Sequence, residues 1–229
     1  MKLGNPFRLL TKFEIGLWTV SVTALLCSFF ASGAADVLSL IASILGVTSL
    51  IFLARGFVIG QALMILFAIL YAIISFKARY YGEMITYLGM SAPAALIAMI
   101  NWLRHPYKES SEVEVSHHLS VAAKLLLGLG TVGATVGFYF ILRALGTANL
   151  LVSTASVATS FLAATLAACR NPYYALVYAL NDLVLIALWI AVMRGDLAAL
   201  NMTICFVVFL VNDLYGFFSW LRMAKRQRE

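Results

Sequence analysis

Residues 37–76 read VLSLIASILGVTSLIFLARGFVIGQALMILFAILYAIISF, and this stretch decides the fold class. It contains about 40 residues, nearly all apolar, and Arg55-Gly56 divides it. A helix needs about 20 residues to cross the hydrocarbon core of a bilayer, so the stretch is about twice as long as one span. We therefore predict two membrane-spanning helices joined by a tight turn at Arg55-Gly56.

The composition of the whole chain agrees with a membrane protein. Of its 229 residues, 63% are hydrophobic and 11% are charged, whereas a soluble domain averages about 45–50% and 25%. This excludes an ordinary water-soluble globule and makes the lipid bilayer the expected surrounding. The charges that give a net +6 lie mostly between apolar runs, so we interpret them as a topology signal and predict no nucleic-acid partner.

Cysteine and histidine usage predicts no metal, no cofactor and no disulfide framework. Cys27, Cys169 and Cys205 lie within apolar stretches and share no CxxC spacing. The only long loop, residues 104–119, contains the adjacent pair His117-His118. This pair could bind a metal, but no third ligand stands at a zinc-like spacing, so a solvated linker is favoured.

Eight apolar runs can be marked along the chain. Barrel strands are about ten residues of alternating polarity, whereas these runs are longer and continuously apolar. A helix satisfies its own backbone hydrogen bonds in lipid, so we predict an all-α polytopic membrane protein with eight transmembrane helices. The runs are 13–31, 37–54, 57–76, 84–103, 121–142, 149–168, 173–193 and 200–221.

The positive charges predict the orientation, because cytoplasmic loops hold the excess of Lys and Arg. With the amino terminus inside, 12 Lys and Arg residues fall on one side and 4 on the other. Both termini are then cytoplasmic. The alternative for the first run is a secretory signal, because basic residues precede it and Ala31-Ser32-Gly33-Ala34 follows it. Cleavage there would leave seven helices in the same orientation.

Short similarities point to an internal repeat. Thr48-Ser49 returns as Thr159-Ser160 after 111 residues, and Trp102-Leu103-Arg104 returns as Trp220-Leu221-Arg222 after 118. Helices two to four and six to eight also share one orientation, which is typical of a parallel repeat with a substrate site near the midplane. Residues 121–142 then form a linker helix, in which Gly133 and Gly137 give a GxxxG motif for close packing.

This repeat predicts a division of the chain into five parts. They are an extra N-terminal transmembrane helix in 1–34, a first three-helix bundle in 35–104, the cytoplasmic loop and linker helix in 105–145, a second three-helix bundle in 146–222, and a basic cytoplasmic tail in 223–229.

Two Asn-Asp pairs lie inside the spans and need an explanation. Asn181-Asp182 and Asn212-Asp213 fall near the centres of the seventh and eighth runs, where an ionised side chain costs about 2.5–3.5 kcal/mol. Neighbouring side chains on a helix diverge by about 100°, so one member of each pair can face a cavity while the other bonds a neighbouring helix. The aspartates could instead be structural, and the sequence leaves both readings open.

Aromatic and polar side chains near these pairs are typical of a site for a flat polar ring. Tyr174, Tyr178 and Asn181 or Asp182 share one helical face, although Tyr174 could equally be an interfacial anchor. In the first half Gln61, Tyr71 and Tyr87 are the candidates for the opposite wall. Pro93 weakens the fourth helix, as a gate or as a static kink.

Two stretches carry a resemblance to a known family. LYAIISFKARYYGEM at 70–84, with Pro93 and Trp102 beyond it, and VNDLYGFFSWLR at 211–222 resemble the PnuC family of bacterial vitamin transporters. The resemblance implies a SWEET-like fold of two three-helix bundles joined by one helix. It also implies uptake of nicotinamide riboside, or in relatives of riboflavin, thiamine or deoxynucleosides, followed by intracellular phosphorylation. Nicotinamide riboside carriers have a tryptophan-rich segment here, where this chain reads YYALVYALND.

The predicted function is uptake of a vitamin or nucleoside-like compound, with nicotinamide riboside as the favoured substrate, by facilitated diffusion across the bacterial cytoplasmic membrane. The chain contains no P-loop, which excludes the ATPase of a pump. Paired aspartates match an intramembrane protease only superficially, so no enzyme is predicted. A proton-coupled carrier is the main alternative, and a homo-oligomer is left open. The predicted substrate-binding residues are Gln61, Tyr71, Tyr87, Tyr174, Tyr178, Asn181, Asp182, Asn212 and Asp213.

Overall fold

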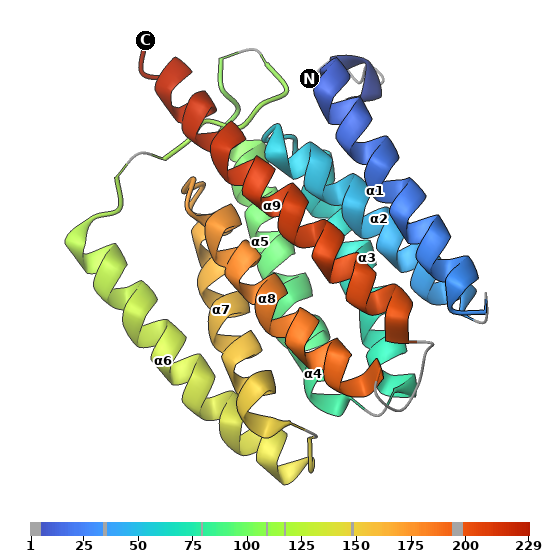
Figure 1. Cartoon of the computed structure of the whole chain (residues 1–229). Helices are drawn as coiled ribbons and strands as arrows, with labels where there is room; N and C mark the ends of the chain where they lie inside the picture. The colour runs from blue at the N-terminus through green and yellow to red at the C-terminus, as the bar shows by residue number, and fades with distance from the viewer. Residues whose placement is uncertain are drawn as a thin grey trace.

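The computed structural model describes residues 6–33, 36–78, 80–108, 110–116, 118–147, 149–193 and 199–229. Its elements are helical, eight stretches are long and apolar enough to cross a membrane, and the described residues form no strand beyond isolated bridges (Figure 1). The prediction of eight transmembrane helices is confirmed. The helices are η1 (Pro6–Leu9), α1 (Lys12–Ala31), α2 (Val37–Ala54), α3 (Val58–Lys77), α4 (Tyr81–Thr86), the π-helix η2 (Tyr87–Ser91), α5 (Ala92–Arg104), α6 (Val121–Ala144), α7 (Leu150–Ala168), α8 (Tyr174–Met193) and α9 (Leu200–Arg226).

Six of the helices form a closed ring. Each helix contacts the next in the order α2, α3, α5, α7, α8, α9, and α9 returns to α2. Exchanging the triplet α2–α3–α5 for α7–α8–α9 leaves this order of contacts unchanged. The grouping into two bundles at 35–104 and 146–222, with the linker in 105–145, stays a prediction.

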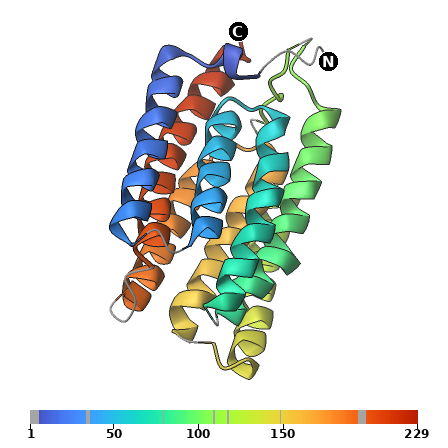
Figure 2. The ribbon, with the colours of Figure 1, turned by 90° about the vertical axis from the view of Figure 1, so that its right-hand side faces the viewer.

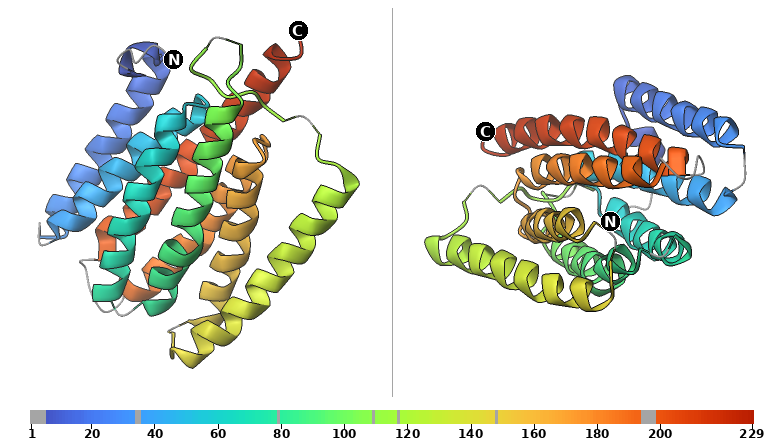
Figure 3. Two further views of the ribbon diagram at one scale, coloured as in Figure 1. Left: turned by 180° about the vertical axis from the view of Figure 1, so that it is seen from behind. Right: turned by 60° about the horizontal axis from the view of Figure 1, so that its bottom comes forward.

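The other two long helices lie outside the ring. Helix α1 packs on α2 and α9, and α6 packs on α7 and touches α4. Figure 2 shows α1 alongside α9, and both views in Figure 3 place α6 on the side of the ring away from α1. Each outer helix therefore covers one of the two seams where the triplets meet.

The predicted tight turn at Arg55-Gly56 is present. Helix α2 ends at Ala54 and α3 begins at Val58, and Gly56 has a φ of +68°, which a residue without Cβ adopts readily. The amide of Phe57 donates to the carbonyl of Phe52 over 2.9 Å. A second turn, between α7 and α8, repeats this pattern, with Arg170 at a φ of +57° and the Asn171 amide donating to the Leu166 carbonyl.

The fourth span differs from the prediction at its start and its centre. It begins at Tyr81 instead of residue 84, which places Glu83 inside it. Its middle is the π-helix η2, in which the Ala92 amide donates to the Tyr87 carbonyl, followed at once by Pro93. Because proline has no amide hydrogen, the wider π turn accommodates the broken hydrogen-bond ladder.

The loop between α5 and α6 was predicted to be a solvated linker, and the structure differs from this prediction. We call residues 110–116 the strap, because it binds both turns: the Val113 amide donates to the Gly56 carbonyl and the Ser116 amide to the Arg170 carbonyl, each over 3.0 Å. The Val113 and Val115 side chains are buried, and burial of both valines opposes a free loop. His117, Lys2, Arg79 and Arg194, which entered the metal and charge arguments, lie outside the described residues.

The GxxxG prediction for α6 also differs from the structure. A Cβ added at Gly133 or Gly137 would meet no atom within 4 Å. The close packing expected within the chain is therefore missing from its described part, because the face that carries these glycines is turned away from the ring.

Candidate functional site

A cavity lies at the centre of the ring, where the six helices meet. Five of the six ring helices contribute to its lining, and in place of α5 it is η2, the preceding segment of the same span, that reaches the cavity. Examples are Leu50 from α2, Phe67 from α3, Tyr87 from η2, Ser160 from α7, Asn181 from α8 and Asp213 from α9. Its volume is about 30 Å³, which is little more than the room that water needs. A vitamin-sized ligand therefore enters only when the ring helices move apart.

The polar wall of the cavity is built on α7 and α8. The Asn181 Oδ1 atom accepts hydrogen bonds from Thr159 Oγ1 at 2.8 Å and Ser160 Oγ at 3.0 Å. These two donors fix the orientation of the amide, because its oxygen is already used. The amide nitrogen has no hydrogen-bond partner among the described residues, so its two donors are left for a ligand.

Two carboxyl groups face one another across α8 and α9. Asp182 and Asp213 both line the cavity, are almost fully buried, and lie close enough to interact. Asp182 Oδ2 has no hydrogen-bond partner in the described chain. No Lys or Arg in the same description lines this cavity. Two adjacent carboxylates repel one another, so this pair must either hold a proton or be neutralised by a positively charged ligand.

Aromatic rings form the rest of the wall. Tyr178 comes from α8, Tyr87 from η2, Phe67 from α3, and Phe206 and Phe209 from α9. The phenylalanines were missed in the sequence because α3 and α9 each contain more than one phenylalanine among many apolar residues, and only the ring geometry shows which of them turn inward. The cavity thus combines flat apolar faces with amide and carboxyl groups.

Five of the nine predicted site residues line this cavity, namely Tyr87, Tyr178, Asn181, Asp182 and Asp213. The other four lie elsewhere. Tyr71 packs behind Tyr87 with 4.3 Å between ring centroids, and Gln61 is buried near the start of α3. The Tyr174 hydroxyl donates to the Leu53 carbonyl over 3.2 Å. Asn212 turns toward α1, and its Nδ2 donates to Ser21 Oγ over 3.1 Å.

Comparison with known proteins now adds to this geometry. A model of the nicotinamide mononucleotide transporter family matches residues 36–222. The chain belongs to this family. The resemblance to the PnuC family found in the sequence is thereby confirmed, and the protein is a multi-pass membrane transporter.

Individual relatives can be aligned with this chain along most of their length. The nicotinamide riboside transporter PnuC of Neisseria mucosa is 24% identical over 220 residues, which cover 94% of this chain and 83% of the relative. The PnuC of Haemophilus influenzae is 22% identical over 190 residues, covering 82% and 81%. The fold resembles the crystal structure of the vitamin B3 transporter PnuC, with a TM-score of 0.82 at 23% identity over 95% and 94% of the two chains.

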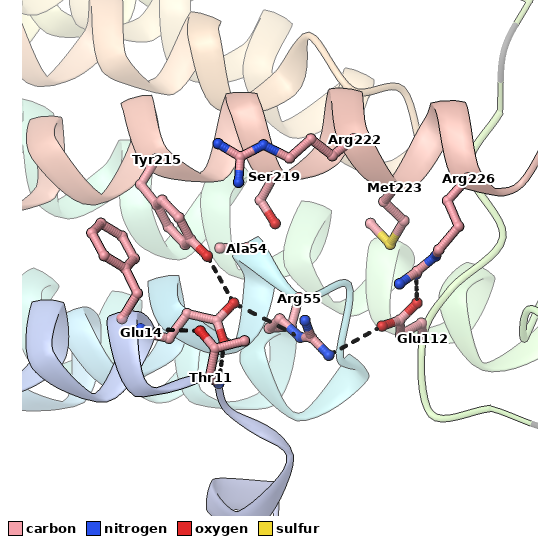
Figure 4. Close-up of a pocket in the computed structure, with 11 residues that line it drawn as sticks. Thr11, Glu14, Ala54, Arg55, Glu112, Tyr215, Ser219, Arg222, Met223 and Arg226 are labelled. Atoms are coloured by element: carbon pink, nitrogen blue, oxygen red, sulfur yellow. Dashed lines mark hydrogen bonds and ion pairs between the residues drawn. The ribbon is translucent and has the colours of Figure 1, made fainter.

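A second and larger cavity of this transporter has a volume of about 710 Å³ (Figure 4). Its lining includes residues near the start of α1 and the end of α9, which places it at the end of the ring that carries both termini (Figure 1). Its charged side chains form a chain of contacts. Arg55 Nε lies 3.8 Å from Glu14 Oε1, Arg55 Nη2 lies 3.4 Å from Glu112 Oε1, and Glu112 pairs with Arg226. The Tyr215 hydroxyl donates to Glu14 Oε1 over 2.8 Å. These contacts join α1, the α2–α3 turn, the strap and α9.

The charged cavity is a weaker candidate for the substrate site. It lies at one end of the ring, and it touches neither α3, α7 nor α8. A carrier must expose its site to both sides in turn, which favours a position near the midplane between the two halves. The ion pairs of Figure 4 instead hold the strap and the outer helix α1 against the ring.

Proposed function

We propose that this transporter carries nicotinamide riboside into the cell by facilitated diffusion and binds it in the central cavity. The observation that supports this most directly is the wall shared by Tyr178, Asn181 and Asp182. An aromatic face, free amide donors and a carboxyl suit a flat, polar, positively charged ring such as nicotinamide, with the remaining groups available to the ribose. The relatives from Neisseria mucosa and Haemophilus influenzae are nicotinamide riboside transporters, which favours the same substrate.

The proposal places the chain in the cytoplasmic membrane of a bacterium with both termini inside. Movement of the triplets α2–α3–α5 and α7–α8–α9 against one another would open the site to each side in turn. The exchange symmetry of the ring contacts supports such rocking. The strap crosses the two turns on the side of the termini, so opening toward the cytoplasm must strain or release it.

In this proposal, transport is coupled neither to ATP hydrolysis nor to an ion gradient. The sequence lacks a nucleotide-binding P-loop, and the described residues include no buried Lys or Arg that could exchange partners with Asp182 or Asp213. An uncoupled carrier only equalises free substrate. Accumulation then depends on a separate enzyme that phosphorylates the product, because the added charge of about −1.5 to −2 opposes its return through a cavity that carries carboxyl groups.

Reconstituted liposomes test the energetics. Vesicles that contain only this protein should equilibrate labelled nicotinamide riboside and then stop, whether or not a proton or sodium gradient is imposed. Empty vesicles are the control. Uphill accumulation driven by either gradient would contradict facilitated diffusion and favour the proton-coupled alternative, for which the buried Asp182–Asp213 pair is the specific observation.

Calorimetry with the purified protein tests the substrate. Nicotinamide riboside should bind more tightly than riboflavin, thiamine or a deoxynucleoside. Tighter binding of one of these three would keep the site and change the ligand. Binding of none would remove the proposed substrate class altogether.

A further inference from the structure

Glu83 is a buried carboxyl group that the central cavity does not include. It lies on α4, one helical turn before Tyr87, and only 1% of its surface is exposed. Neither carboxyl oxygen has a hydrogen-bond partner in the described chain, and no described Lys or Arg forms an ion pair with it. Structural carboxyls in protein interiors are ordinarily hydrogen-bonded or paired, so packing alone does not explain this one.

Tyrosine side chains lie near Glu83, and two of them, Tyr80 and Tyr87, stand about one helical turn before and after it. Its carboxyl group lies close enough to Tyr71, Tyr80 and Tyr87 for electrostatic interaction. The ring of Tyr80 lies 5.7 Å from that of Trp189, and the Tyr71 ring lies 6.2 Å from it. Trp189 Nε1 donates to the Tyr71 hydroxyl over 2.8 Å, which fixes both rings. The rings of Tyr71, Tyr80 and Trp189 thus hold one another in place, while the Glu83 carboxyl oxygens have no hydrogen-bond partner in the described chain.

The cluster lies on one side of the central cavity. Tyr87 belongs to both, because it lines the cavity and packs against Tyr71 at 4.3 Å. Glu83 and Tyr80 lie farther toward the α3–α4 turn, at the end of the ring opposite both termini (Figure 1). A ligand that arrives from that end therefore meets the cluster around Glu83 before it reaches Asp182.

A carboxylate among aromatic faces is the chemistry that recognises an organic cation. Ring faces attract positive charge through their quadrupole, and a desolvated site strengthens that attraction. We propose that Glu83, Tyr71, Tyr80 and Trp189 form an outer binding site for the positively charged ring of the permeant, from which the ring passes Tyr87 into the central cavity. This inference rests on the proposed function, because nicotinamide riboside carries its positive charge on the pyridinium nitrogen.

The test compares a charged and a neutral ligand of nearly the same shape. Reduction of the pyridinium ring by hydride transfer removes the charge and gives dihydronicotinamide riboside. The Glu83→Gln variant should lower the initial rate of nicotinamide riboside uptake into liposomes by roughly tenfold, since it removes the negative charge from a desolvated aromatic site. Uptake of the neutral reduced compound should change by less than about twofold, because its aromatic and hydroxyl contacts are retained.

Two further variants keep the test decisive. Glu14→Gln is the matched control, because Glu14 is equally buried but lies at the opposite end beside Arg55; it should affect both compounds alike. Tyr80→Leu removes one ring face and keeps the carboxyl, and it should reproduce the selective loss in smaller degree. It also replaces Glu83→Gln if that variant does not fold.

The outcomes separate this inference from the proposed function. If the variants at Glu83 and Tyr80 slow both compounds equally, the cluster is structural and the outer site is wrong. If wild-type protein takes up neither compound, the substrate proposal fails, and the same variants are then compared on cationic thiamine and neutral riboflavin. A selective loss for thiamine would still support the cation site, and equal effects would overturn it.

Discussion

The two triplets of the ring have similar contacts where they close the ring at the end with the termini, and they differ in the buried carboxyl groups at and beside the central cavity. At the end with the termini, Trp102 of α5 donates its indole hydrogen to the Ala167 carbonyl of α7 over 2.8 Å. Trp220 of α9 donates in the same way to the Leu53 carbonyl of α2 over 2.7 Å. The two indoles then meet at 5.2 Å between centroids. Each triplet thus contributes one tryptophan to a symmetric pair of contacts, and we call Trp102 and Trp220 with these contacts the clasp.

The buried carboxyl groups show no such symmetry. Asp213 precedes Trp220 by seven residues, and at the same distance before Trp102 stands the apolar Ala95. The first triplet carries its buried carboxyl at Glu83 instead, beside a π-helix that has no counterpart among the described residues of the second. Repetition therefore identifies the residues that close the ring, and departures from it point to the residues that a ligand meets.

The largest expected effect comes from breaking the clasp. Trp102→Ala and Trp220→Ala should each lower the free energy of unfolding by about 3–5 kcal/mol, the usual cost of truncating a fully buried large aromatic side chain. Denaturant unfolding in detergent measures both, with the half-exposed Phe218→Ala as a control that should cost far less. Similar losses from the two variants would sharpen the comparison. A loss from one alone would show that only one half depends on its tryptophan.

A smaller effect is expected where the two halves touch around the cavity. A Cβ at Gly46 would lie 2.2 Å from Phe209 Cζ and 3.0 Å from Phe67 Cδ2, and both rings line the cavity. Gly46→Ala should push these rings inward, lower stability by about 1–3 kcal/mol as overpacking does, and weaken ligand binding. Gly216→Ala is the matched control, because its nearest atom would be 3.6 Å away. Calorimetric binding that is equal in both variants would contradict the position of the site.

The two Asn-Asp pairs of the second triplet allow a similar contrast. Asn181→Ala should weaken ligand binding by about 1–3 kcal/mol, because it removes amide donors that face the cavity. Asn212→Ala should leave the affinity nearly unchanged and lower stability by about 1 kcal/mol, because its amide bonds Ser21 on α1. Calorimetry and thermal unfolding separate the two effects. An affinity loss at Asn212 as large as at Asn181 would place the ligand nearer α1 than we propose.

The sequence predicted the helices well because apolar length is a local property of the chain. The divided stretch at 37–76 became two helices and a turn because no other arrangement fits a bilayer. Side-chain direction was harder to predict, since Tyr174 and Tyr178 share a helical face, yet only Tyr178 reaches the cavity while Tyr174 bonds the Leu53 carbonyl. That distinction depends on how far along the ring axis each residue lies, which only the packed ring defines.

Two features were missed for different physical reasons. Glu83 falls at the edge of an apolar run, where hydropathy cannot separate a loop residue from the first turn of a buried helix. The strap was missed although its sequence held a signal. Residues 112–115 read EVEV, and this alternation places Val113 and Val115 on one side, where both are buried.

The smallest expected effect concerns the two turns that the strap binds, which have different residues at the position with positive φ. Gly56 and Arg170 hold equivalent places with positive φ, and an L side chain in that conformation costs about 1–2 kcal/mol. Gly56→Ala should therefore lower the free energy of unfolding by about that amount, all the more because its Cβ would approach Met223 Cε to 3.1 Å. Arg170→Gly relieves the same strain, but it loses the contacts of Nη1 with the Glu114 carbonyl at 3.2 Å and carboxylate at 3.4 Å. Its net effect should stay within about 1 kcal/mol, because the Glu114 side chain of that ion pair is exposed. Denaturant unfolding measures the free energy of unfolding of both variants. If Arg170→Gly loses as much stability as Gly56→Ala, then Arg170 stabilises the second turn through its contacts with the strap, and the strain of its backbone conformation is of lesser importance.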